Sequence, residues 1–468
     1  MSANKLQFFD TYTRGNKPFV SSDTSKGFVG LYSCGPTVYA YPHIGNLRAY
    51  VFSDTLRRVL EYNGYNVKQV INITDVGHLT SDADEGEDKI ALQAIKTGKT
   101  AWEIAEYFTE AFRRDLDSLN IEKPHVLSKA TDHVSEQIAL IKKLEERGFA
   151  YRTSDGVYFD TLKFPDYGHM ARLQSRGLKA GARVAFNPEK HDLTDFALWK
   201  FSPTNQKRQM EWQSPWGIGF PGWHIECSAM SMKYLGETID IHTGGIDHIP
   251  VHHTNEIAQS EAATGKQFVR YWLHCAFLLV DGQKMSKSLG NLFTLDDLMA
   301  RGYDPMVFRY LLHTVHYRKQ INFTWESLAA AKSALNSLRT ALAEWPDGGL
   351  ADATVVSEFH SRINDDLDMP TAVALLWEVT KGGLPSEVKK ATLIEFDKVL
   401  GLQFVHSKSD RININEVPAE VQTLLKEREQ ARNQKNWSES DRLRDMIRSL
   451  GYVVEDARDG IQIKRSTQ

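Results

Sequence analysis

The sequence has few cysteines, little net charge and no long apolar run, and each of these features excludes a class of protein. Three cysteines in 468 residues are too few for a disulfide framework, so we expect a reducing, cytoplasmic compartment. A net charge of −4 is incompatible with a basic field over the whole surface, so contacts with nucleic acid must be local. No stretch is apolar enough to span a bilayer or to form a signal peptide, and we expect no membrane partner.

The first 75 residues carry the pattern of a βαβ unit. The apolar run Val29–Ser33 predicts a strand, apolar residues at helical spacing follow from Leu47 to Leu60, and the β-rich run Asn66–Thr74 predicts a second strand. A strand–helix–strand unit of this length implies a parallel sheet. Such sheets bind ligands at the carboxyl ends of their strands.

The same α/β pattern resumes after Trp216. It predicts a helix from His224 to Leu235, a strand from Thr238 to His242, a helix from His252 to Ala263 and a strand from Tyr271 to Val280. The sheet is therefore split by an insertion. We predict the α/β fold class, with a Rossmann-type parallel sheet in two halves followed by an α-helical C-terminal region.

Amphipathic spacing and turn signals predict the other segments. Residues 82–150 are expected to be mainly helical, and Asp155-Gly156 marks the turn of a hairpin. The acidic run Asp82–Asp88 is expected to be a solvated loop or a helix cap rather than a metal site. The predicted segments are 1–120 and 211–303 for the two halves of the sheet, 121–210 for the connective insertion, 304–345 for a helical connector, and 346–468 for a helical region with a small terminal unit.

The run "PHIGN", Pro42–Asn46, opens the first predicted helix. Unpaired N–H groups and a partial positive charge at a helix N-terminus suit phosphate. Gly45 would let a nucleotide approach the backbone, and His43 could donate a hydrogen bond to phosphate oxygens. A capping or core histidine is the alternative for so short a string.

The run "KMSKS", Lys284–Ser288, lies on a glycine-flanked loop after a predicted strand. Its two lysines, Lys284 and Lys287, would form a cationic clamp for triphosphate oxygens and for the charge of a phosphoryl-transfer transition state. A solvated basic loop explains the spacing equally well.

Thiol, imidazole and carboxylate side chains suggest a metal site. His252 and Glu256 are four residues apart on one helix face, Cys34 follows the first strand, and Cys227 lies in a helix near the neighbouring strand. Zinc accepts all three ligand types. The residues alone do not separate His252 from His253, because Glu256 is within reach of either. Ordinary core residues are the alternative for each histidine, and three others compete as ligands: His224, His242 and His248.

The "PHIGN" and "KMSKS" runs, in this order on the two halves of a split sheet, resemble the hallmark motifs of class I aminoacyl-tRNA synthetases. Four further runs, "CGPTVYAYPHIGN", "INITD", "GWHIECSAMS" and "HHTNEIAQSE", resemble the cysteinyl-tRNA synthetase family, and the likeness covers nearly the whole chain. The resemblance implies that the protein ligates L-cysteine to tRNA(Cys) through cysteinyl-adenylate, and we expect the protein to be a monomer. The resemblance further implies ATP as a substrate with Mg²⁺, one Zn²⁺ per chain, a stem-contact role for 304–345 and anticodon binding by 346–468.

The resemblance also assigns roles to single residues. The zinc ligands it implies are Cys34, Cys227, His252 and Glu256, which would settle the choice between the two adjacent histidines. The ATP contacts it implies are His43, Gly45, Asn46, Lys284 and Lys287, all of them catalytic except Gly45. The contacts to cysteine it implies are Gly35, Thr74, Trp223 over the side chain and Asp247 at the amino group.

Two departures from the family pattern bear on these roles. Asn46 stands where the His-x-Gly-His pattern has its last histidine, although an amide can still donate to phosphate. After "NITD" the chain continues "VGHLTSDADEGEDKI", which is longer than the common "IDDKI" form. The path of the loop 75–90 and the role of Asp75 are therefore left open.

A metal would explain how such an enzyme selects cysteine. Serine is a near-isostere, and shape alone would separate the two by only about 1–3 kcal/mol. Zinc favours a thiolate and deprotonates a coordinating thiol, so we predict selection by the metal and no editing domain. Near the C-terminus, four residues could stack on or pair with bases of the tRNA: Trp437, Arg442, Arg444 and Arg448. The alternative for these residues is a solvated, charged helix face.

Two rival functions share parts of this pattern. A cysteine ligase of the same ancestry, which passes cysteine to a small amine, needs no full anticodon domain, yet this chain continues from Trp345 to Gln468. A non-catalytic RNA-binding paralogue should have lost the "KMSKS" run or a zinc ligand, and all of them are present.

Overall fold

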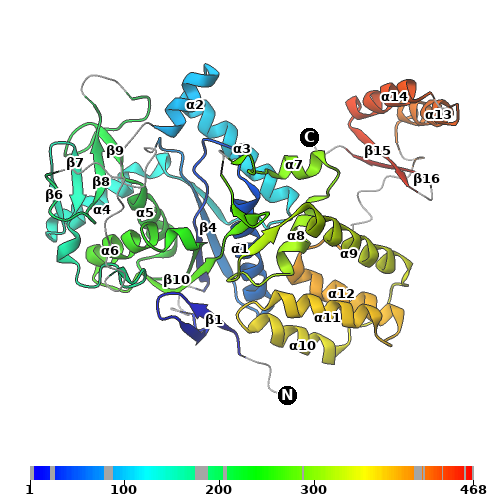
Figure 1. Cartoon of the computed structure of the whole chain (residues 1–468), viewed down its shortest axis with the longest axis horizontal. Coiled ribbons are helices and arrows are strands. Elements are labelled where there is room, and N and C mark those ends of the chain that lie inside the picture. The colour runs from blue at the N-terminus through cyan, green and yellow to red at the C-terminus, as the bar shows by residue number, and fades with distance from the viewer. Residues whose placement is uncertain are drawn as a thin grey trace. The chain divides into compact units, whose positions relative to one another are not determined.

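The computed structural model describes residues 5–21, 27–77, 88–173, 188–203, 208–286, 289–404, 414, 417–434, 436–457 and 460–465. The chain folds as two compact units, Met1–Leu402 and Gln403–Gln468 (Figure 1).

A five-stranded parallel sheet forms the centre of the first unit, in the strand order β11-β10-β3-β4-β5. Its strands are β3 Val29–Ser33, β4 Val67–Ile73, β5 Val126–Lys129, β10 Ile239–Gly245 and β11 Val269–Cys275. Every residue of β3 is buried, as expected of a strand covered on both faces. Because β3 pairs with both β4 and β10, the two halves of the chain meet in mid-sheet. The predicted split Rossmann-type sheet is confirmed, whereas β5 lies in a region that was expected to be mainly helical.

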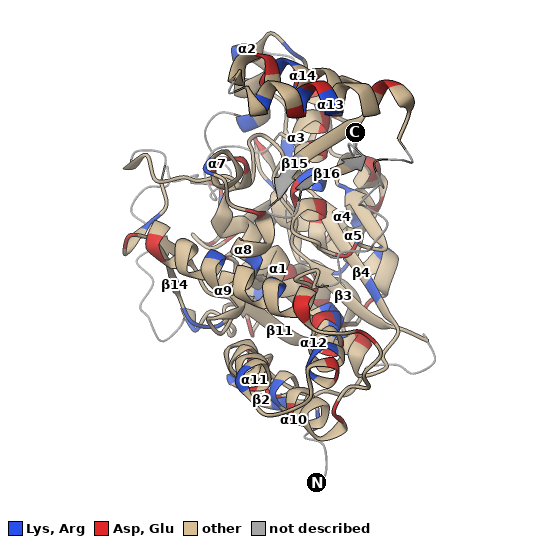
Figure 2. Ribbon diagram, turned by 90° about the vertical axis from the view of Figure 1, so that its right-hand side faces the viewer, with Lys and Arg blue, Asp and Glu red and all other residues tan. Residues whose placement is uncertain are grey.

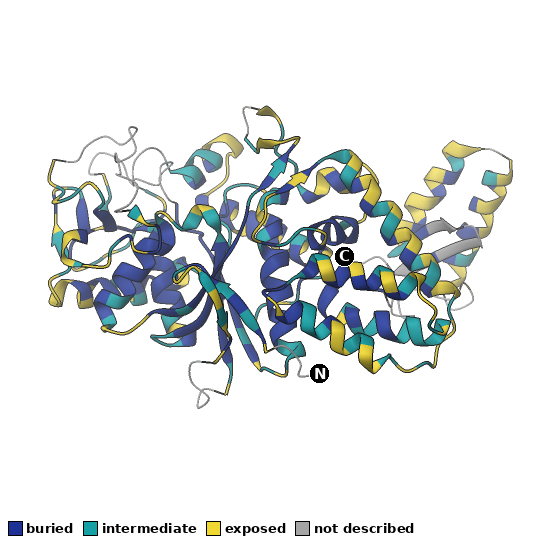
Figure 3. Cartoon of the chain, turned by 60° about the horizontal axis from the view of Figure 1, so that its bottom comes forward, coloured by how far each residue is buried: buried dark blue, intermediate teal, exposed yellow. Residues whose placement is uncertain are grey.

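Helices cover both faces of this sheet (Figure 1). Helix α1 Ile44–Tyr62 packs on one face and α5 Trp223–Leu235 on the other. Outside them, α3 Ala101–Ser118 packs on α1, and α4 Val134–Glu146 and α6 His252–Thr264 pack on α5. Buried residues are concentrated in the sheet and in these helices (Figure 3). Helix α6 is unusual because it buries polar side chains on nearly every face, including two histidines and Glu256. Buried polar groups need hydrogen-bond partners or bound ions, so the polar side chains of α6 indicate a functional site as well as a packing role.

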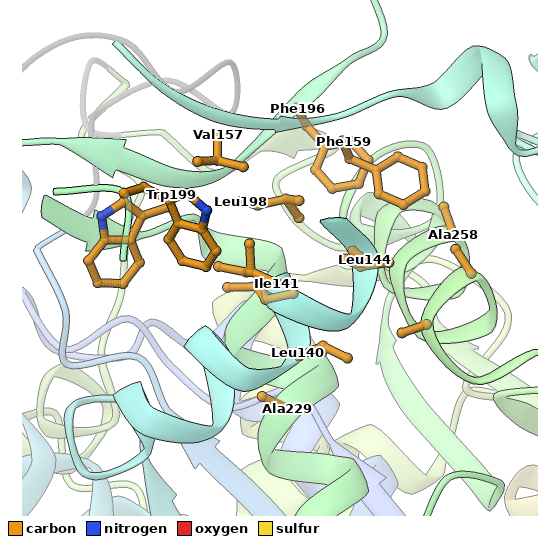
Figure 4. Packing of buried hydrophobic residues seen from close by; sticks show 14 of the residues in the cluster. Leu140, Ile141, Leu144, Val157, Phe159, Phe196, Leu198, Trp199, Ala229 and Ala258 are labelled. Atoms are coloured by element: carbon orange, nitrogen blue, oxygen red, sulfur yellow. The ribbon is translucent and has the colours of Figure 1, made fainter. Parts of the chain in front are cut away.

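An antiparallel sheet lies between the two halves of the parallel sheet in the chain. Its order is β6-β7-β8-β9, with β6 Ala150–Arg152, β7 Gly156–Phe159, β8 Phe196–Phe201 and β9 Gly219–Pro221. The predicted hairpin is confirmed by the antiparallel pairing of β6 with β7. Figure 4 shows side chains of β7 and β8 packed on α4: Val157, Phe159, Phe196 and Leu198 against Leu140, Ile141 and Leu144. Truncating one of these large side chains to alanine would cost about 2–5 kcal/mol.

A small three-stranded sheet follows the parallel sheet. Its order is β13-β12-β14, with β12 Leu278–Val280, β13 Gln283–Lys284 and β14 Ile321–Phe323. The single strand predicted for Tyr271–Val280 is wrong, because the chain is divided into β11 and β12 at Ala276-Phe277. Near the N-terminus, β1 Gln7–Asp10 and β2 Gly15–Pro18 form an antiparallel hairpin.

The other helices of the first unit are α2 Lys89–Thr97, α7 Leu295–Ala300, α8 Pro305–His313, α9 Trp325–Glu344, α10 Ala353–Asn364, α11 Met369–Lys381 and α12 Ser386–Leu400. Asp88, the last residue of the acidic run, caps α2 by accepting hydrogen bonds from the amides of Ile90 and Ala91. The rest of that run lies outside the described residues.

The second unit contains α13 Ala419–Asn433, α14 Trp437–Ser449 and the hairpin of β15 Tyr452–Ala457 with β16 Gly460–Arg465. It has a hydrophobic core of its own, to which Leu425, Leu443, Ile447 and Ile463 contribute. In Figure 2 the ribbons of α13 and α14 carry both basic and acidic residues. Among the described residues, no helix has the length and apolar character needed to cross a membrane.

Candidate metal centre and nucleotide site

Four potential metal ligands from three elements converge at the carboxyl end of the parallel sheet. Cys34 directly follows β3, Cys227 lies in α5, and His252 and Glu256 lie in α6. One donor atom from each residue lies within 4.8 Å of the donor atoms of the other three. The amide of Cys34 also donates a hydrogen bond of 3.1 Å to the carbonyl of Thr243 in β10, which fixes the thiol where the two halves of the sheet meet. The structure thus brings together the four residues that the resemblance implied.

A second, overlapping group of donors lies equally close together. Cys34 and Glu256 also form a group with His242 and His253 within 4.8 Å. The Nε2 atom of His253 is 3.2 Å from Sγ of Cys34, and Nε2 of His242 is 2.7 Å from Oε2 of Glu256. The choice between two adjacent histidines therefore persists in the geometry. What distinguishes the groups is the second thiol, which belongs only to the group that contains His252.

The two thiols titrate as a pair. A hydrogen bond to Cys34 lowers the pKa of Cys227 to about 7, against the opposing effect of burial. Burial and the neighbouring Cys227 raise the pKa of Cys34 well above its ordinary value. One thiolate is therefore available near neutral pH, and a metal ion would deprotonate the second thiol.

Opposite charges hold Glu256 and His252 in their ionised forms. Burial opposes the charge of Glu256, but His242 and His252 lower the pKa of Glu256 far below its ordinary value. Burial also opposes the charge of His252, but Glu256 and then Cys227 raise the pKa of His252 to about 10.

The donor set fits zinc. The Oε1 atom of Glu256 lies 2.7 Å from Nε2 of His252, and no other described residue donates a hydrogen bond to this buried oxygen. A cation held by both atoms would satisfy the carboxylate and replace the proton on the imidazole. Two thiols, an imidazole and a carboxylate are ligands that zinc accepts in a tetrahedral site.

A second layer of histidines surrounds the ligand side chains. Nδ1 of His224 is 3.0 Å from Nδ1 of His252, and Nδ1 of His253 is 2.7 Å from Nε2 of His274. Nδ1 of His274 is in turn 2.8 Å from Oγ1 of Thr11. Burial lowers the pKa of His253 and His274 well below the ordinary value, so both are neutral. Outer partners of this kind orient metal ligands. No sequence pattern points to His274 or Thr11, because only the fold brings them to the site.

Two of the expected contacts to cysteine border the metal centre. Trp223 begins α5, and its ring centroid is 4.4 Å from that of His252. The amide of Gly35, directly after Cys34, donates a hydrogen bond of 2.7 Å to Oδ1 of Asn72. A Cβ atom at Gly35 would lie 1.6 Å from the carbonyl oxygen of Asn72, so only glycine fits there.

The other two expected contacts lie beyond the ends of β4 and β10, the two strands that flank β3. Thr74 is buried beyond the end of β4, where it bridges to Thr37 and its Oγ1 accepts a hydrogen bond of 3.1 Å from Asn72. Asp247 lies in the exposed turn Ile246–His248 after β10. Burial lowers the pKa of His43, and the negative charge of Asp247 opposes part of this lowering. Asp247 is thus within electrostatic reach of the start of α1.

His43 and Asn46 close the first turn of α1 in a reciprocal cap. Nδ1 of His43 accepts a hydrogen bond from the amide of Asn46, and Oδ1 of Asn46 accepts one from the amide of His43, both at 3.2 Å. Because Nδ1 is the acceptor, the neutral imidazole carries its proton on Nε2, where it can be donated to a phosphate oxygen. Burial lowers the pKa of His43, which favours this neutral form. The cap and the phosphate role are therefore compatible.

The "KMSKS" run begins next to α1. Lys284 ends β13, is exposed, and has its Nζ atom 5.5 Å from the ring centroid of Phe277. The side chain of Met285 reaches Gly45 of α1, because a Cβ atom at Gly45 would lie 2.2 Å from Cε of Met285. The two runs that the sequence singled out for phosphate therefore meet. Lys287 lies outside the described residues.

Comparisons with known proteins define the class. Residues 20–333 match the catalytic domain of class I (C) tRNA synthetases, and residues 415–463 match the cysteinyl-tRNA ligase anticodon-binding domain. The fold resembles that of Mycobacterium tuberculosis methionyl-tRNA synthetase in complex with methionyl-adenylate, with a TM-score of 0.56 and 16% identity over 81% of this chain and 92% of that chain. The first unit contains the catalytic fold of a class I aminoacyl-tRNA synthetase.

Curated relatives narrow this class to one family. The chain is 54% identical to cysteine–tRNA ligase 1 of Burkholderia lata, over 97% of this chain and 96% of that protein. It is 42% identical to cysteine–tRNA ligase of Treponema denticola, over 95% of this chain and 96% of that protein. This chain belongs to the cysteine–tRNA ligase family.

Proposed function

We propose that this chain forms cysteinyl-adenylate from L-cysteine and ATP and then transfers the cysteinyl group to the 3′-terminal ribose of tRNA(Cys). The observation that carries the proposal is the convergence of four metal-ligating side chains at the end of the split sheet that also carries the start of α1. The reaction joins an amino-acid carboxylate to a nucleotide phosphate. A thiol-selective centre near an anion-binding helix end is the arrangement that such a reaction on cysteine requires.

In this proposal Cys34, Cys227, His252 and Glu256 hold one zinc ion. When bound there, zinc supplies a soft Lewis acid that favours a thiolate over the hydroxyl of serine. The protein residues around it bind and orient the substrate. Trp223 covers the cysteine side chain, Gly35 and Thr74 line the site beside it, and Asp247 accepts hydrogen bonds from the amino group.

The ATP site in this proposal is the start of α1 together with the "KMSKS" run. The Nε2–H group of His43 and the side-chain amide of Asn46 donate to phosphate oxygens, and Gly45 leaves room for the nucleotide. Lys284 and Lys287 neutralise the charge of the triphosphate, which Mg²⁺ accompanies. The carboxylate of cysteine attacks the α-phosphate, and the bond between the α- and β-phosphates breaks to release pyrophosphate. Transfer of the cysteinyl group to the ribose then releases AMP. No protein nucleophile is needed, and positioning and charge stabilisation carry the rate.

The proposal extends to the tRNA. Residues 304–345 contact its stem, and residues 346–468 read the anticodon loop. The two halves of the catalytic domain are 1–120 and 211–303, and the insertion between them is 121–210. The exposed residues Trp437, Arg442, Arg444 and Arg448 of α14 are the candidate contacts. Two of these arginines form ion pairs on their own helix, with Glu439 and Asp441. Solvent-exposed pairs of this kind contribute little to stability, so phosphate can displace them. We propose that the protein works as a cytoplasmic monomer.

The test is ATP–pyrophosphate exchange with a panel of amino acids, followed by charging of tRNA(Cys). We expect exchange with cysteine, none with serine, and charging of tRNA(Cys). Activation of cysteine without charging of tRNA would instead indicate a cysteine ligase that uses a small amine. Activation of no amino acid would contradict any catalytic function.

A further inference from the structure

Arg48 is a buried cation in the second turn of α1. It is 3% exposed, and among the described residues no carboxylate pairs with it. Its guanidinium instead donates hydrogen bonds to the backbone carbonyls of Ala276, Phe277, His316, Tyr317 and Lys319. An ionised guanidinium is costly to bury unless its donors are used, so these carbonyls are what keeps the charge inside.

These carbonyls lie at two junctions of the three-stranded sheet. Ala276 and Phe277 join β11 to β12, and Nη1 of Arg48 lies 2.8 Å and 2.6 Å from their oxygens. The other carbonyls belong to residues 316–319, which lead from α8 into β14. Since β12 pairs with both β13 and β14, Arg48 holds the whole small sheet against α1.

The "KMSKS" run is anchored to α1 on both sides. Before the run, the carbonyl of Phe277 is held by Arg48 and its ring lies under the ammonium group of Lys284, at 5.5 Å from centroid to Nζ. After the run, the amide of Ile44 donates a hydrogen bond of 2.8 Å to the carbonyl of Phe293. Both anchors are in the first two turns of the helix that begins with the other phosphate-binding run.

We propose that Arg48 is a positioning residue for adenylate formation, because it fixes the sheet that carries Lys284 relative to His43 and Asn46. The hydrogen-bond donors of both runs are then already in position when the triphosphate binds, so the small sheet does not have to be ordered during the reaction. This inference rests on the proposed function, since it needs both runs to act on ATP. It concerns the ATP side of the site only. The hydrogen bonds of Arg48 reach neither α5 nor α6, the helices that carry three of the four metal ligands.

The test compares Arg48→Met with Arg57→Met in the full, zinc-loaded chain. Arg57 is a matched control because it is also a largely buried arginine of α1 that donates to a backbone carbonyl, that of Lys123, at 2.8 Å. Its other partners, Glu61 and Glu122, are likewise away from the small sheet.

In Arg48→Met we expect the single-turnover rate of adenylate formation to fall roughly 100-fold, as a displacement of about 1 Å can cause. The KM for ATP should rise, whereas the zinc content and the Kd for cysteine should not change. Hydrogen exchange of the amides in Leu278–Val280 and Ile321–Phe323 should become faster. Arg57→Met should not lower the rate of adenylate formation, raise the KM for ATP or speed hydrogen exchange in the small sheet more than it affects cysteine binding.

Two results would overturn the inference. One is an equal loss of cysteine binding and adenylate formation in Arg48→Met, and the other is the same pattern in Arg57→Met. If Arg48→Met does not fold, Arg48→Lys, which keeps the charge but reaches fewer carbonyls, should show a smaller loss confined to the ATP step; a loss shared with cysteine binding would again overturn it. If the unmodified chain activates no cysteine, the proposed function is contradicted. If the unmodified chain is active but the Arg48 variant does not affect the ATP step more than cysteine binding, only the role of Arg48 is contradicted.

Discussion

The imidazole of His253 lies 3.2 Å from the thiol of Cys34, although the family resemblance assigns the metal to the adjacent His252. Cys34 belongs to both donor groups, and only the group with His252 contains a second thiol, that of Cys227. The two groups therefore differ in the number of thiolate ligands that they would offer to a metal. That number can be measured.

Cobalt substitution should count the thiolates. We expect the Co²⁺-loaded chain to show a thiolate-to-cobalt charge-transfer band in the near ultraviolet, which Cys227→Ser should reduce to about half. His253→Gln, which keeps an N–H donor, should leave the intensity of the band unchanged. A band that survives Cys227→Ser unchanged and is lost in the His253 variant would assign the metal to the second group.

The Cys227→Ser variant should also separate the two substrates. Because the metal centre belongs to the cysteine side of the site, this variant should bind less zinc and weaken the binding of cysteine more than the binding of ATP. Calorimetric titration with each substrate, together with metal analysis, is the measurement. Equal weakening of both would mean that Cys227 is a structural residue.

Two glycines of the site should respond differently to an added methyl group. A Cβ atom at Gly35 would lie 1.6 Å from a backbone oxygen, that of Asn72, whereas at Gly45 it would meet the flexible end of Met285 at 2.2 Å. Gly35→Ala should therefore lower the free energy of unfolding by about 1–3 kcal/mol or more. Gly45→Ala should leave that free energy nearly unchanged and raise the KM for ATP. Denaturant unfolding and exchange kinetics measure the two effects, and a fully stable Gly35→Ala variant would contradict the tight fit.

Local pattern was sufficient to predict parts of the fold. The strand predicted at Val29–Ser33 is confirmed residue for residue, because a buried apolar run is bounded there by a cysteine and a Gly-Pro turn. The strand predicted for Tyr271–Val280 is wrong because Arg48, from a distant helix, holds the carbonyls of Ala276 and Phe277 at the point where the chain turns. No local sequence pattern predicts a hydrogen bond between a strand end and a side chain more than 200 residues earlier in the chain.

The candidate site shows the same division. The sequence identified the ligand types and, through the family resemblance, the family itself, which the comparisons confirm. It did not identify the outer histidine His274 or its partner Thr11, because each meets the centre only through tertiary contacts. The assignment of His252 rather than His253 came from the resemblance and not from spacing, and the structure keeps both rings next to potential ligands.

The two lysines of the "KMSKS" run should act on the chemical step and not on the binding of cysteine. Lys284→Ala and Lys287→Ala should each lower the rate of adenylate formation by about 100- to 1000-fold, because each removes a charge that stabilises the transition state. Zinc content and the Kd for cysteine should stay the same. Lys266→Ala is the control, since Lys266 is exposed and pairs with Glu237 on the surface. A parallel loss of cysteine affinity in the two lysine variants would point to a structural role.

Stability in acid should depend on His313. Burial, followed by the charge of Arg309, lowers the pKa of His313 to about 3, and its Nε2 lies 2.9 Å from the carbonyl oxygen of Leu400. Below pH of about 6.5 the unfolded chain binds a proton here that the folded chain does not, so stability is lost as the pH falls, by up to about 1.4 kcal/mol per pH unit. His313→Gln keeps an N–H donor without a titratable group and should be less sensitive between pH 6 and 4. Unfolding curves at several pH values should converge for the two proteins at pH 8; parallel curves throughout would show that His313 does not contribute.

Removal of residues 403–468 should separate the two steps of the reaction. The second unit has its own core, built from residues such as Leu425, Leu443 and Ile447, so its loss should leave the core of the first unit intact. The metal ligands, the start of α1 and the "KMSKS" run all belong to the first unit. The shortened chain should therefore retain cysteine-dependent ATP–pyrophosphate exchange at the rate of the full chain. Charging of tRNA(Cys) should fall sharply, mainly through a higher KM for tRNA, because the region that matches the anticodon-binding domain is gone. Full charging activity in the shortened chain would contradict anticodon recognition by this unit, and a loss of exchange would show that the second unit supports the catalytic one.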